Sequence, residues 1–290
     1  MEMAGGYGVR AVQRSFAVLR VLSEASGPRS LPSIASEAGL TVTTTFRLLR
    51  TLMAEGVVQA HEEGYMLGLR VLELAEALSR QLDIVRVARP FLLRLQAELD
   101  ETCGLGARSG DSWVTVAHVE STQPVRRVMR VGERQALAAT ATGRVFLAHD
   151  SDADVSAYVS RTDPEVYREA VGGPEQLWAS IHDIRERGYA WVVNARNTGG
   201  WGIRHPVYRH NGEIAAVLSI ACPRDRFADE FRDRCREAGR RIAQEMSTSL
   251  GYTGGYPRVL SGVSGGDAAR PSSVGALAGQ ASRSPTSWEE

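Results

Sequence analysis

Hydrophobic positions in the N-terminal part of the chain recur at helical intervals, in short segments separated by glycine, serine and proline. In residues 9–25, Val12 and Phe16 fall on one helical face, and a Ser-Gly-Pro run ends the segment. A second helix is predicted to begin after Ser30, whose hydroxyl can cap its first turn, and to end at Gly39. The pattern therefore predicts two helices within the first forty or so residues.

Residues 41–53 have the pattern of a third helix with a sharply divided surface. Leu48, Leu49 and Leu52 share one face, which we expect to pack against the two preceding helices. The opposite face carries hydroxyl groups and arginines, and it has no acid before Glu55. Short hydroxyl side chains allow a helix to lie deep in a DNA major groove, where an arginine can pair with guanine or phosphate. The residues of this polar face are Thr43, Thr44, Arg47, Arg50 and Thr51.

Two short strands are predicted next, at 56–59 and 65–67, around a Glu-Glu-Gly turn. Helix, turn, helix and hairpin in this order are typical of a winged helix-turn-helix that binds DNA. Because the hairpin has no Arg or Lys, we expect at most backbone and His61 contacts from it. We predict a DNA-binding domain over 9–70, with Ser30 as a further candidate contact. The alternative is a small amphipathic helix with a solvated polar face.

Residues 71–84 are predicted to form a linker helix with more apolar surface than a connecting helix needs. Its stripe is expected to pack on a second subunit, or alternatively on the chain's own second domain. Because a dimer doubles the bases that a single helix can read, we predict a homodimer or a homotetramer.

Residues 85–251 mix short apolar runs with helical periodicity, and Asn211-Gly212 is a hairpin turn. An antiparallel sheet covered by helices is expected, so the fold class is α+β with two domains. Strands are predicted at 105–107, 113–119, 126–131, 189–193, 202–208 and 214–221. Helices are predicted at 85–99, 142–149, 153–160, 174–187 and 229–250. Residues 1–8 and the Gly/Ser/Pro-rich segment 252–290 are expected to be disordered.

The composition limits the partners. The 290 residues carry 34 basic and 34 acidic side chains, and every basic one is arginine. A neutral chain is poorly suited to nonspecific nucleic-acid binding, so positive charge must gather on one face for DNA binding. The candidates are Arg10, Arg14, Arg29, Arg47 and Arg50.

Other classes of site find little support in the sequence. The three cysteines are scattered without a Cys-x-x-Cys pair, so neither a disulfide framework nor a metal site is expected. No nucleophile elbow is present, and no cofactor is predicted. An apolar run long enough for a membrane is absent, so no membrane partner is expected and the cytoplasm is the predicted location.

Several segments, in order, resemble the IclR family of bacterial transcription regulators. The matching segments are RAVQRSFAVLRVLSEA, GLTVTTTFRLLRTL, GYMLGLRVLELA, VGERQALAATATGRVFLA, IRERGYA and GGWGIRHPVYRHNGEIAAVLSIACP. The resemblance covers about residues 9–250. It implies a winged helix-turn-helix, a linker helix and a GAF-like effector-binding domain. It also implies dimers or tetramers, a palindromic double-stranded DNA operator, and a small organic acid or aromatic effector.

The third helix departs from the family pattern in places. Thr44 and Arg47 match it, whereas Thr43 stands for a usual Ser and Phe46 for a usual His or Tyr. Val42 occupies a position that is often basic or polar. The operator sequence therefore cannot be carried over from relatives.

The family's effector cavity implies backbone near Ala141 and Thr142, an acidic side chain before the final hairpin, and small polar groups on the last strands. Asn194 stands at the acidic position here, and Ala221 stands where a second Ser would follow Ser219. Gly202 replaces a Cys of some relatives, and Cys222 is either a cavity residue or a core hydrophobe. The candidate effector-binding residues are Ala141, Thr142, Asn194, Gly202, Ser219, Ala221 and Cys222.

With fewer hydroxyls, the predicted cavity favours a larger or more apolar effector than glyoxylate or pyruvate. The leading hypothesis is a ligand-responsive, sequence-specific regulator, either a repressor or an activator, and not an enzyme. One alternative is an enzyme that kept a helix-turn-helix for assembly. Another is a constitutive DNA-binding or interaction protein whose sensing domain binds no effector.

Overall fold

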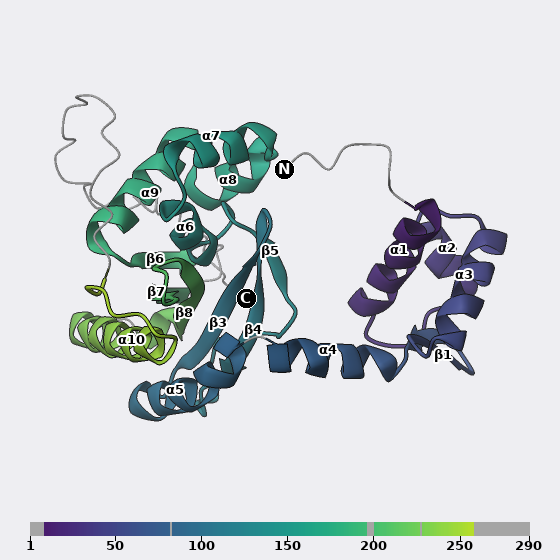
Figure 1. The fold of residues 1–290 in the computed structure, drawn as a ribbon, viewed down its shortest axis with the longest axis horizontal. Coiled ribbons are helices and arrows are strands. Elements are labelled where there is room, and N and C mark those ends of the chain that lie inside the picture. The colour runs from purple at the N-terminus through teal and green to yellow at the C-terminus, as the bar shows by residue number, and fades with distance from the viewer. Residues whose placement is uncertain (1–8, 82, 196–199, 227, 258–290) are drawn as a thin grey trace, which may run out of the picture.

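The structure, a computed structural model, describes residues 9–81, 83–195, 200–226 and 228–257. Figure 1 shows a small N-terminal unit joined by helix α4 to a larger unit of sheet and helices. The predicted disorder of 1–8 and of 258–290 lies outside the described residues. Within the described ranges, no helix is both long and apolar enough to cross a membrane.

Three helices and a hairpin form the N-terminal unit. They are α1 (Arg10–Glu24), α2 (Leu31–Glu37), α3 (Val42–Ala54), β1 (Val58–His61) and β2 (Gly64–Leu67). The Ser30 hydroxyl accepts from the Ser33 amide at 3.4 Å, and the Thr41 hydroxyl accepts from the Thr44 amide at 3.2 Å. These two caps set where α2 and α3 begin. A small core of Val18, Val21, Leu22, Ile34, Leu49 and Val58 holds the unit together.

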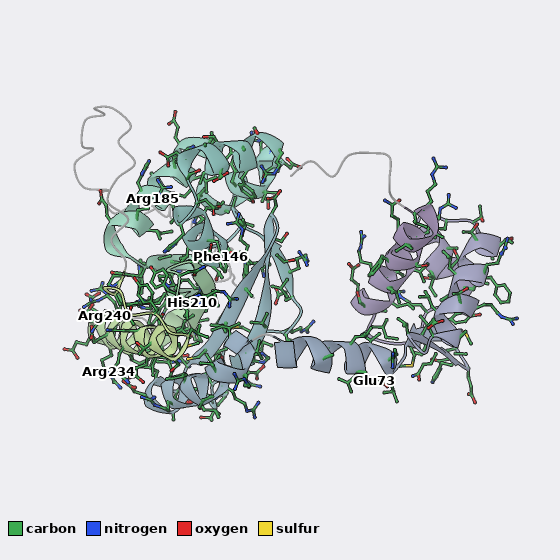
Figure 2. The ribbon with its side chains drawn as sticks, viewed as in Figure 1. Glu73, Phe146, Arg185, His210, Arg234 and Arg240 are labelled. Carbon is green, nitrogen blue, oxygen red and sulfur yellow. The ribbon has the colours of Figure 1, made fainter. Side chains whose placement is uncertain are left out.

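Helix α4 (Arg70–Gln81) lies between the two units, and α5 (Asp83–Leu99) packs against the sheet. Figure 2 shows Glu73 on α4, well away from the larger unit. Apolar side chains on this helix lack cover in a single chain: Leu72 and Leu74 are 68% and 56% exposed.

The larger unit is built on one six-stranded antiparallel sheet, in the order β5-β4-β3-β8-β7-β6. Its strands are β3 (Thr102–Ser109), β4 (Ser112–Val119), β5 (Arg134–Ala136), β6 (Ala190–Ala195), β7 (Gly200–Tyr208) and β8 (Ile214–Pro223). Side chains on adjacent strand positions point to opposite faces, so each strand serves two layers.

The strand predicted at 126–131 is wrong, because β5 lies further along the chain. Val125, Val128 and Val131 point outwards and are each more than 60% exposed, so they do not form a buried sheet face. The Arg127 carbonyl accepts from the Thr102 hydroxyl at 2.6 Å instead of from a strand amide. The apolar residues of this segment therefore indicated a strand where none forms.

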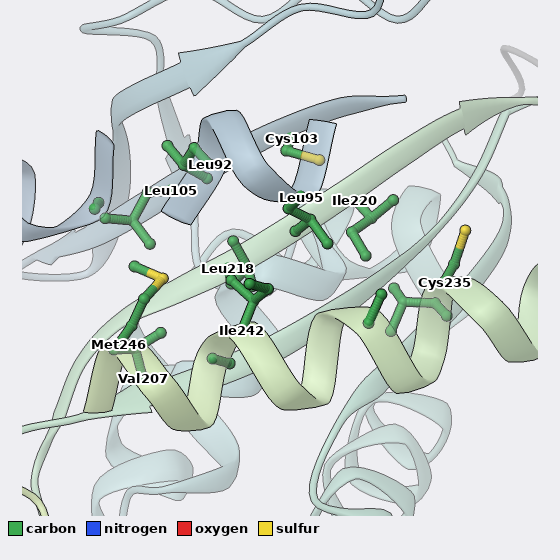
Figure 3. Packing of buried hydrophobic residues seen from close by; sticks show 14 of the residues in the cluster. Leu92, Leu95, Cys103, Leu105, Val207, Leu218, Ile220, Cys235, Ile242 and Met246 are labelled. Carbon is green, nitrogen blue, oxygen red and sulfur yellow. The ribbon is translucent and has the colours of Figure 1, made fainter. Parts of the chain in front are cut away.

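Helices cover both faces of the sheet. Helices α5 and α10 (Asp229–Ser249) pack on one face, where Leu218 and Ile220 of β8 meet them (Figure 3). Cys222 of β8 belongs to the same buried cluster. The other face is covered by α6 (Ala141–Ala148), α7 (Asp152–Arg161), α8 (Pro164–Val171) and α9 (Pro174–Arg187).

The segment after α10 is packed at its start, so the prediction of disorder from residue 252 is wrong for 252–257. The Tyr256 hydroxyl donates to the Pro206 carbonyl at 2.8 Å, and the Tyr208 and Tyr252 rings lie 5.0 Å apart. Aromatic rings supply the contact that the Gly/Ser/Pro composition of this segment did not indicate.

Candidate DNA-reading helix and effector cavity

The polar face of α3 is open to solvent. Thr43, Arg47 and Arg50 are exposed, and none has a hydrogen bond or ion pair to another side chain in the described ranges. The Thr51 hydroxyl donates to the Arg47 carbonyl at 3.3 Å, and the Thr44 hydroxyl accepts from Thr41 at 2.9 Å. Two of the five candidate side chains are thus held by their own helix, and three are free to meet a DNA groove.

Ser30 lies beside this helix-turn-helix at the junction with the wing. Its neighbour Arg29 pairs through its backbone with Tyr65 of β2, at 2.9 and 2.8 Å. A Cβ on Gly64 would lie 2.2 Å from the Arg29 carbonyl oxygen, so the wing approaches α2 at a glycine. The side chain of Arg29 also reaches Glu37 at 3.5 Å, so this arginine adds little free charge.

The polar face has an apolar border. Val42 and Phe46, which follow helical spacing beside Thr43, are 49% and 42% exposed. Apolar side chains at such positions can contact the methyl group of thymine in the major groove. Phe46 was not among the predicted DNA contacts. Its departure from the family pattern was the feature of the sequence that could have indicated this apolar border.

A cavity of about 1020 Å³ lies between the sheet and α6. Four of the seven candidate effector residues line it: Ala141, Thr142, Ser219 and Ala221. Asn194 lies in β6 where the pairing with β7 shifts register, and its side chain is outside the described set.

Cys222 and Gly202 do not line the cavity, contrary to the prediction. Strand alternation turns Cys222 to the opposite face, into the core with Cys103 and Cys235. Gly202 instead makes room for a neighbour, because a Cβ there would lie 2.5 Å from Nη1 of Arg204.

Arg204 also lines the cavity, although it was not among the predicted effector-binding residues. Its Nε donates to Thr142 Oγ1 at 3.1 Å, and its Nη1 donates to the carbonyls of Ile203 and Ile220 at 3.0 and 2.7 Å. Burial lowers the pKa of Arg204 to about 10, so the guanidinium stays charged at neutral pH. Its only sequence signal was a glycine two positions earlier on the same strand face.

A second arginine, Arg144 on α6, also lines the cavity. Its Nε donates to Ser180 Oγ at 3.0 Å, and its Nη1 donates to the Ala138 carbonyl at 3.3 Å. Burial lowers the pKa of Arg144 to about 10 as well. Arg144 and Arg204 therefore give the cavity wall positive charge.

Apolar and aromatic side chains form much of the remaining wall, including Leu105, Trp113, Met129, Val166 and Trp191. Trp113 is held in place because its Nε1 donates at 2.8 Å to Thr140, the residue that caps α6. A Cβ on Gly106 would lie 2.7 Å from the Trp113 ring, so this glycine makes room for the indole. The two acids of the wall, Glu133 and Glu169, are solvent-exposed.

Nucleophilic and metal chemistry gain no support from this arrangement. Burial strongly raises the pKa of the Cys103 and Cys222 thiols, which keeps them neutral. Across the part of the chain that the structure describes, no cluster of His, Cys, Asp and Glu could hold a metal ion.

An exposed helix-turn-helix joined to a domain with a ligand-sized cavity defines a DNA-binding transcription regulator. The chain belongs to the IclR family of bacterial transcription regulators. Residues 11–62 match the model of the IclR helix-turn-helix domain, and residues 76–248 match that of the bacterial transcriptional regulator IclR C-terminal domain.

Curated relatives and solved structures agree with this family. The chain is 29% identical to the HTH-type transcriptional regulator BhcR of Paracoccus denitrificans, over 84% of this chain and 88% of that protein. It is 28% identical to the HTH-type transcriptional repressor AllR of Escherichia coli, over 84% and 91% of the two chains. Because these relatives are transcription regulators, the chain is a regulator and not an enzyme.

The fold recurs in crystal structures of the family. The IclR transcriptional regulator from Alicyclobacillus acidocaldarius matches with a TM-score of 0.74 and 25% identity, over 84% of this chain and all of that one. An IclR homologue from Microbacterium hydrocarbonoxydans, complexed with 4-hydroxybenzoate, matches with a TM-score of 0.71 and 24% identity, over 83% and 98% of the two chains.

Proposed function

We propose that this regulator binds a palindromic double-stranded DNA operator as a homodimer or homotetramer, and that a small organic effector in the cavity modulates the binding. The free side chains of Thr43, Arg47 and Arg50 on α3 carry the DNA part of the proposal. They are exposed on one helical face, whereas the leucines behind them are buried or half-buried. Thr44, Thr51 and Ser30 are proposed to contact the backbone at the edges of this surface.

Assembly is proposed from the apolar residues that one chain leaves uncovered. Leu69, just before α4, and Leu72 and Leu74, within it, are each more than half exposed, as are Val12 and Phe16 of α1. Burying these side chains between two chains would bring two α3 helices to one DNA duplex. A bacterial regulator of this kind acts in the cytoplasm, where the chromosome lies.

The effector part of the proposal rests on the cavity. It borders the α6 N-terminus and the two strands β7 and β8, which connect through the sheet to α5 and the linker helix. An effector changes DNA affinity only if it binds two arrangements of the DNA-binding units with different affinity. We propose that contacts of the ligand with α6 and the sheet provide this difference.

The function is tested by selecting fragments of the source genome with the purified protein at fixed, near-physiological salt. Enrichment of a short palindrome upstream of a few genes is the expected result, and the position of the palindrome relative to the promoter decides between repressor and activator. Binding that depends on salt but enriches no motif would contradict sequence-specific regulation. An enriched motif whose affinity responds to no metabolite would favour the constitutive DNA-binding alternative.

A further inference from the structure

Arg185 and Arg226, two arginines with low exposure outside the cavity, have acidic partners, whereas Arg144 and Arg204 in the cavity wall have none among the described residues. Arg185 on α9, labelled in Figure 2, is 8% exposed and pairs with Asp152 at 2.6 Å. The half-buried Arg226 pairs with the buried Glu101. Within the described residues, neither Arg144 nor Arg204 has a carboxylate within ion-pair distance.

Two uncompensated charges inside a protein are costly. A charge removed from water loses its hydration, and neutral hydrogen-bond acceptors replace only part of it. The positive charges of Arg127 and Arg144 raise the cost of charging Arg204, and all three arginines line the wall. Among the described residues that line the wall, the acids are Glu133 and Glu169; both are exposed to water, which screens their charge and weakens their effect on the arginines.

The hydrogen bonds of Arg204 leave one side of its guanidinium available. Nε and Nη1 are occupied by Thr142, Ile203 and Ile220, whereas Nη2 has no hydrogen bond to any group that the structure describes. The hydroxyls of Thr142 and Ser219 lie 3.4 Å apart beside it, so hydroxyl donors and a guanidinium meet at one point. This set of donors matches the oxygens of a carboxylate or phosphate.

We propose that the cavity binds an organic dianion, with one anionic group held by Arg204, Thr142 and Ser219 and the second charge balanced by Arg144. The size of the cavity and its wall of Trp113, Met129 and Trp191 require an apolar body between or beside the charged groups. The identification of this dianion as the effector rests on the proposed function. Arg204 is the residue that distinguishes the dianion from a neutral molecule of the same shape.

The first experiment uses inorganic phosphate as the probe, at a pH where it is mainly a dianion. The melting temperature of the full chain is compared in phosphate and in chloride at equal ionic strength. We expect phosphate to raise the melting temperature of the wild type by about 4 °C or more near saturation, because a ligand bound only by the native state stabilises it. Equal melting temperatures in the two salts would overturn the proposal.

Variants assign the effect to the cavity. Arg204→Gln and Arg144→Gln should each lose most of the phosphate shift. Arg168→Gln is the matched control, because Arg168 is an exposed arginine on α8 that pairs with Glu165, and it should keep the full shift. A cooperative melting transition in chloride shows that each variant is folded. A folded Arg204→Gln protein with the wild-type shift would refute the role of Arg204.

Matched organic probes then test the need for two charges. Terephthalate, benzoate and terephthalamide share one ring and carry two, one and no negative charges. We expect terephthalate to bind the wild type at least about tenfold more tightly than terephthalamide, and Arg204→Gln to remove most of this preference. Equal affinity for the diamide and the dianion would contradict the proposal.

Operator binding measured on the same samples separates this inference from the proposed function. If the anion binds but operator affinity does not change, the cavity is an anion site but not an effector site. If no operator is found but phosphate raises the melting temperature as expected, the proposed function is wrong and the anion-binding inference still holds.

Discussion

Arginines carry the positive charge both on the polar face of α3 and in the cavity, but the surroundings of the two sets are opposite. Arg47 and Arg50 are exposed, so solvent and salt screen their charges. Arg144 is buried and Arg204 is half-buried, and burial lowers the pKa of each. A charged guanidinium therefore costs little free energy on the surface and more in a cavity. Only the cavity arginines need a counter-ion to offset this cost.

The DNA half of this comparison gives the largest expected effect. Arg47→Ala should weaken specific operator binding by about 1–3 kcal/mol if the guanidinium pairs with a guanine edge. Base preference at one position should relax at the same time. Arg70→Ala is the control, because Arg70 is an exposed arginine at the start of α4 that pairs with Glu73. Binding isotherms at matched salt measure both variants, and equal affinity of Arg47→Ala and wild type would end the base-contact assignment.

A substitution that leaves charge unchanged tests how the cavity arginine Arg204 is positioned. In Gly202→Val, the new Cβ would lie 2.3 Å from the Ile220 carbonyl oxygen and 2.5 Å from Nη1 of Arg204. We expect a loss of about 1–3 kcal/mol in the free energy of unfolding, because backbone and guanidinium must both shift. The phosphate-induced rise in melting temperature should fall as well. Urea unfolding in chloride gives the first quantity, and a fully stable variant would show that Gly202 does not set the position of Arg204.

The burial of His205, on the core-facing side of β7, predicts that stability depends on pH. Burial lowers its pKa from 6.5 to about 3, and its Nε2 has no hydrogen-bond partner among the described groups. In the unfolded chain His205 binds a proton below about pH 6.5, whereas in the native protein it binds one only near pH 3. Native stability therefore falls as the pH decreases through this window. Between pH 6.5 and pH 5, protonation of His205 in the unfolded chain should lower the free energy of unfolding by about 2 kcal/mol.

His205→Gln should remove that part of the acid sensitivity. His210→Gln, at an exposed histidine in the turn after β7, is the matched control and should keep the wild-type slope. Unfolding free energies measured by urea at several pH values would test this. Parallel slopes for wild type and His205→Gln would show that His205 is not the group that titrates.

The smallest expected effect concerns the apolar border of α3. Replacing thymine by uracil in the selected operator removes only methyl groups, and contact with Phe46 should make this cost about 0.8 kcal/mol for each methyl group buried. Phe46→Ala should bind the two DNAs equally, while Arg70→Ala should still prefer thymine. An equal preference in Phe46→Ala and wild type would place Phe46 outside the interface.

Helix α3, which we propose reads DNA, was predictable as a helix because its determinants are local. Thr41 caps it, leucines at helical spacing bury one face, and Thr43, Arg47 and Arg50 are left on the other face by the same periodicity. The sheet was largely predictable for the same reason, since alternation and the Asn211-Gly212 turn are short-range signals. The strand expected at 126–131 failed because apolar residues do not show which side of a segment meets the rest of the protein.

The cavity was only partly predictable, because its chemistry depends on residues far apart in the chain. The resemblance pointed to Thr142 and Ser219, and strand alternation placed Ser219 and Ala221 on one face. Arg204, in contrast, has the sequence surroundings of an ordinary strand arginine. Only the approach of α6 to the sheet brings it within 3.1 Å of Thr142 and leaves it half-buried in the cavity wall.

The most direct test of the comparison measures operator affinity and the phosphate-induced shift in melting temperature on Arg47→Ala and Arg204→Gln together. We predict that Arg47→Ala loses operator affinity and keeps the full phosphate shift. Arg204→Gln should keep operator affinity in chloride and lose the shift. If either folded variant loses both properties, or if each keeps both, the division between an exposed DNA-reading surface and a charged ligand cavity is wrong.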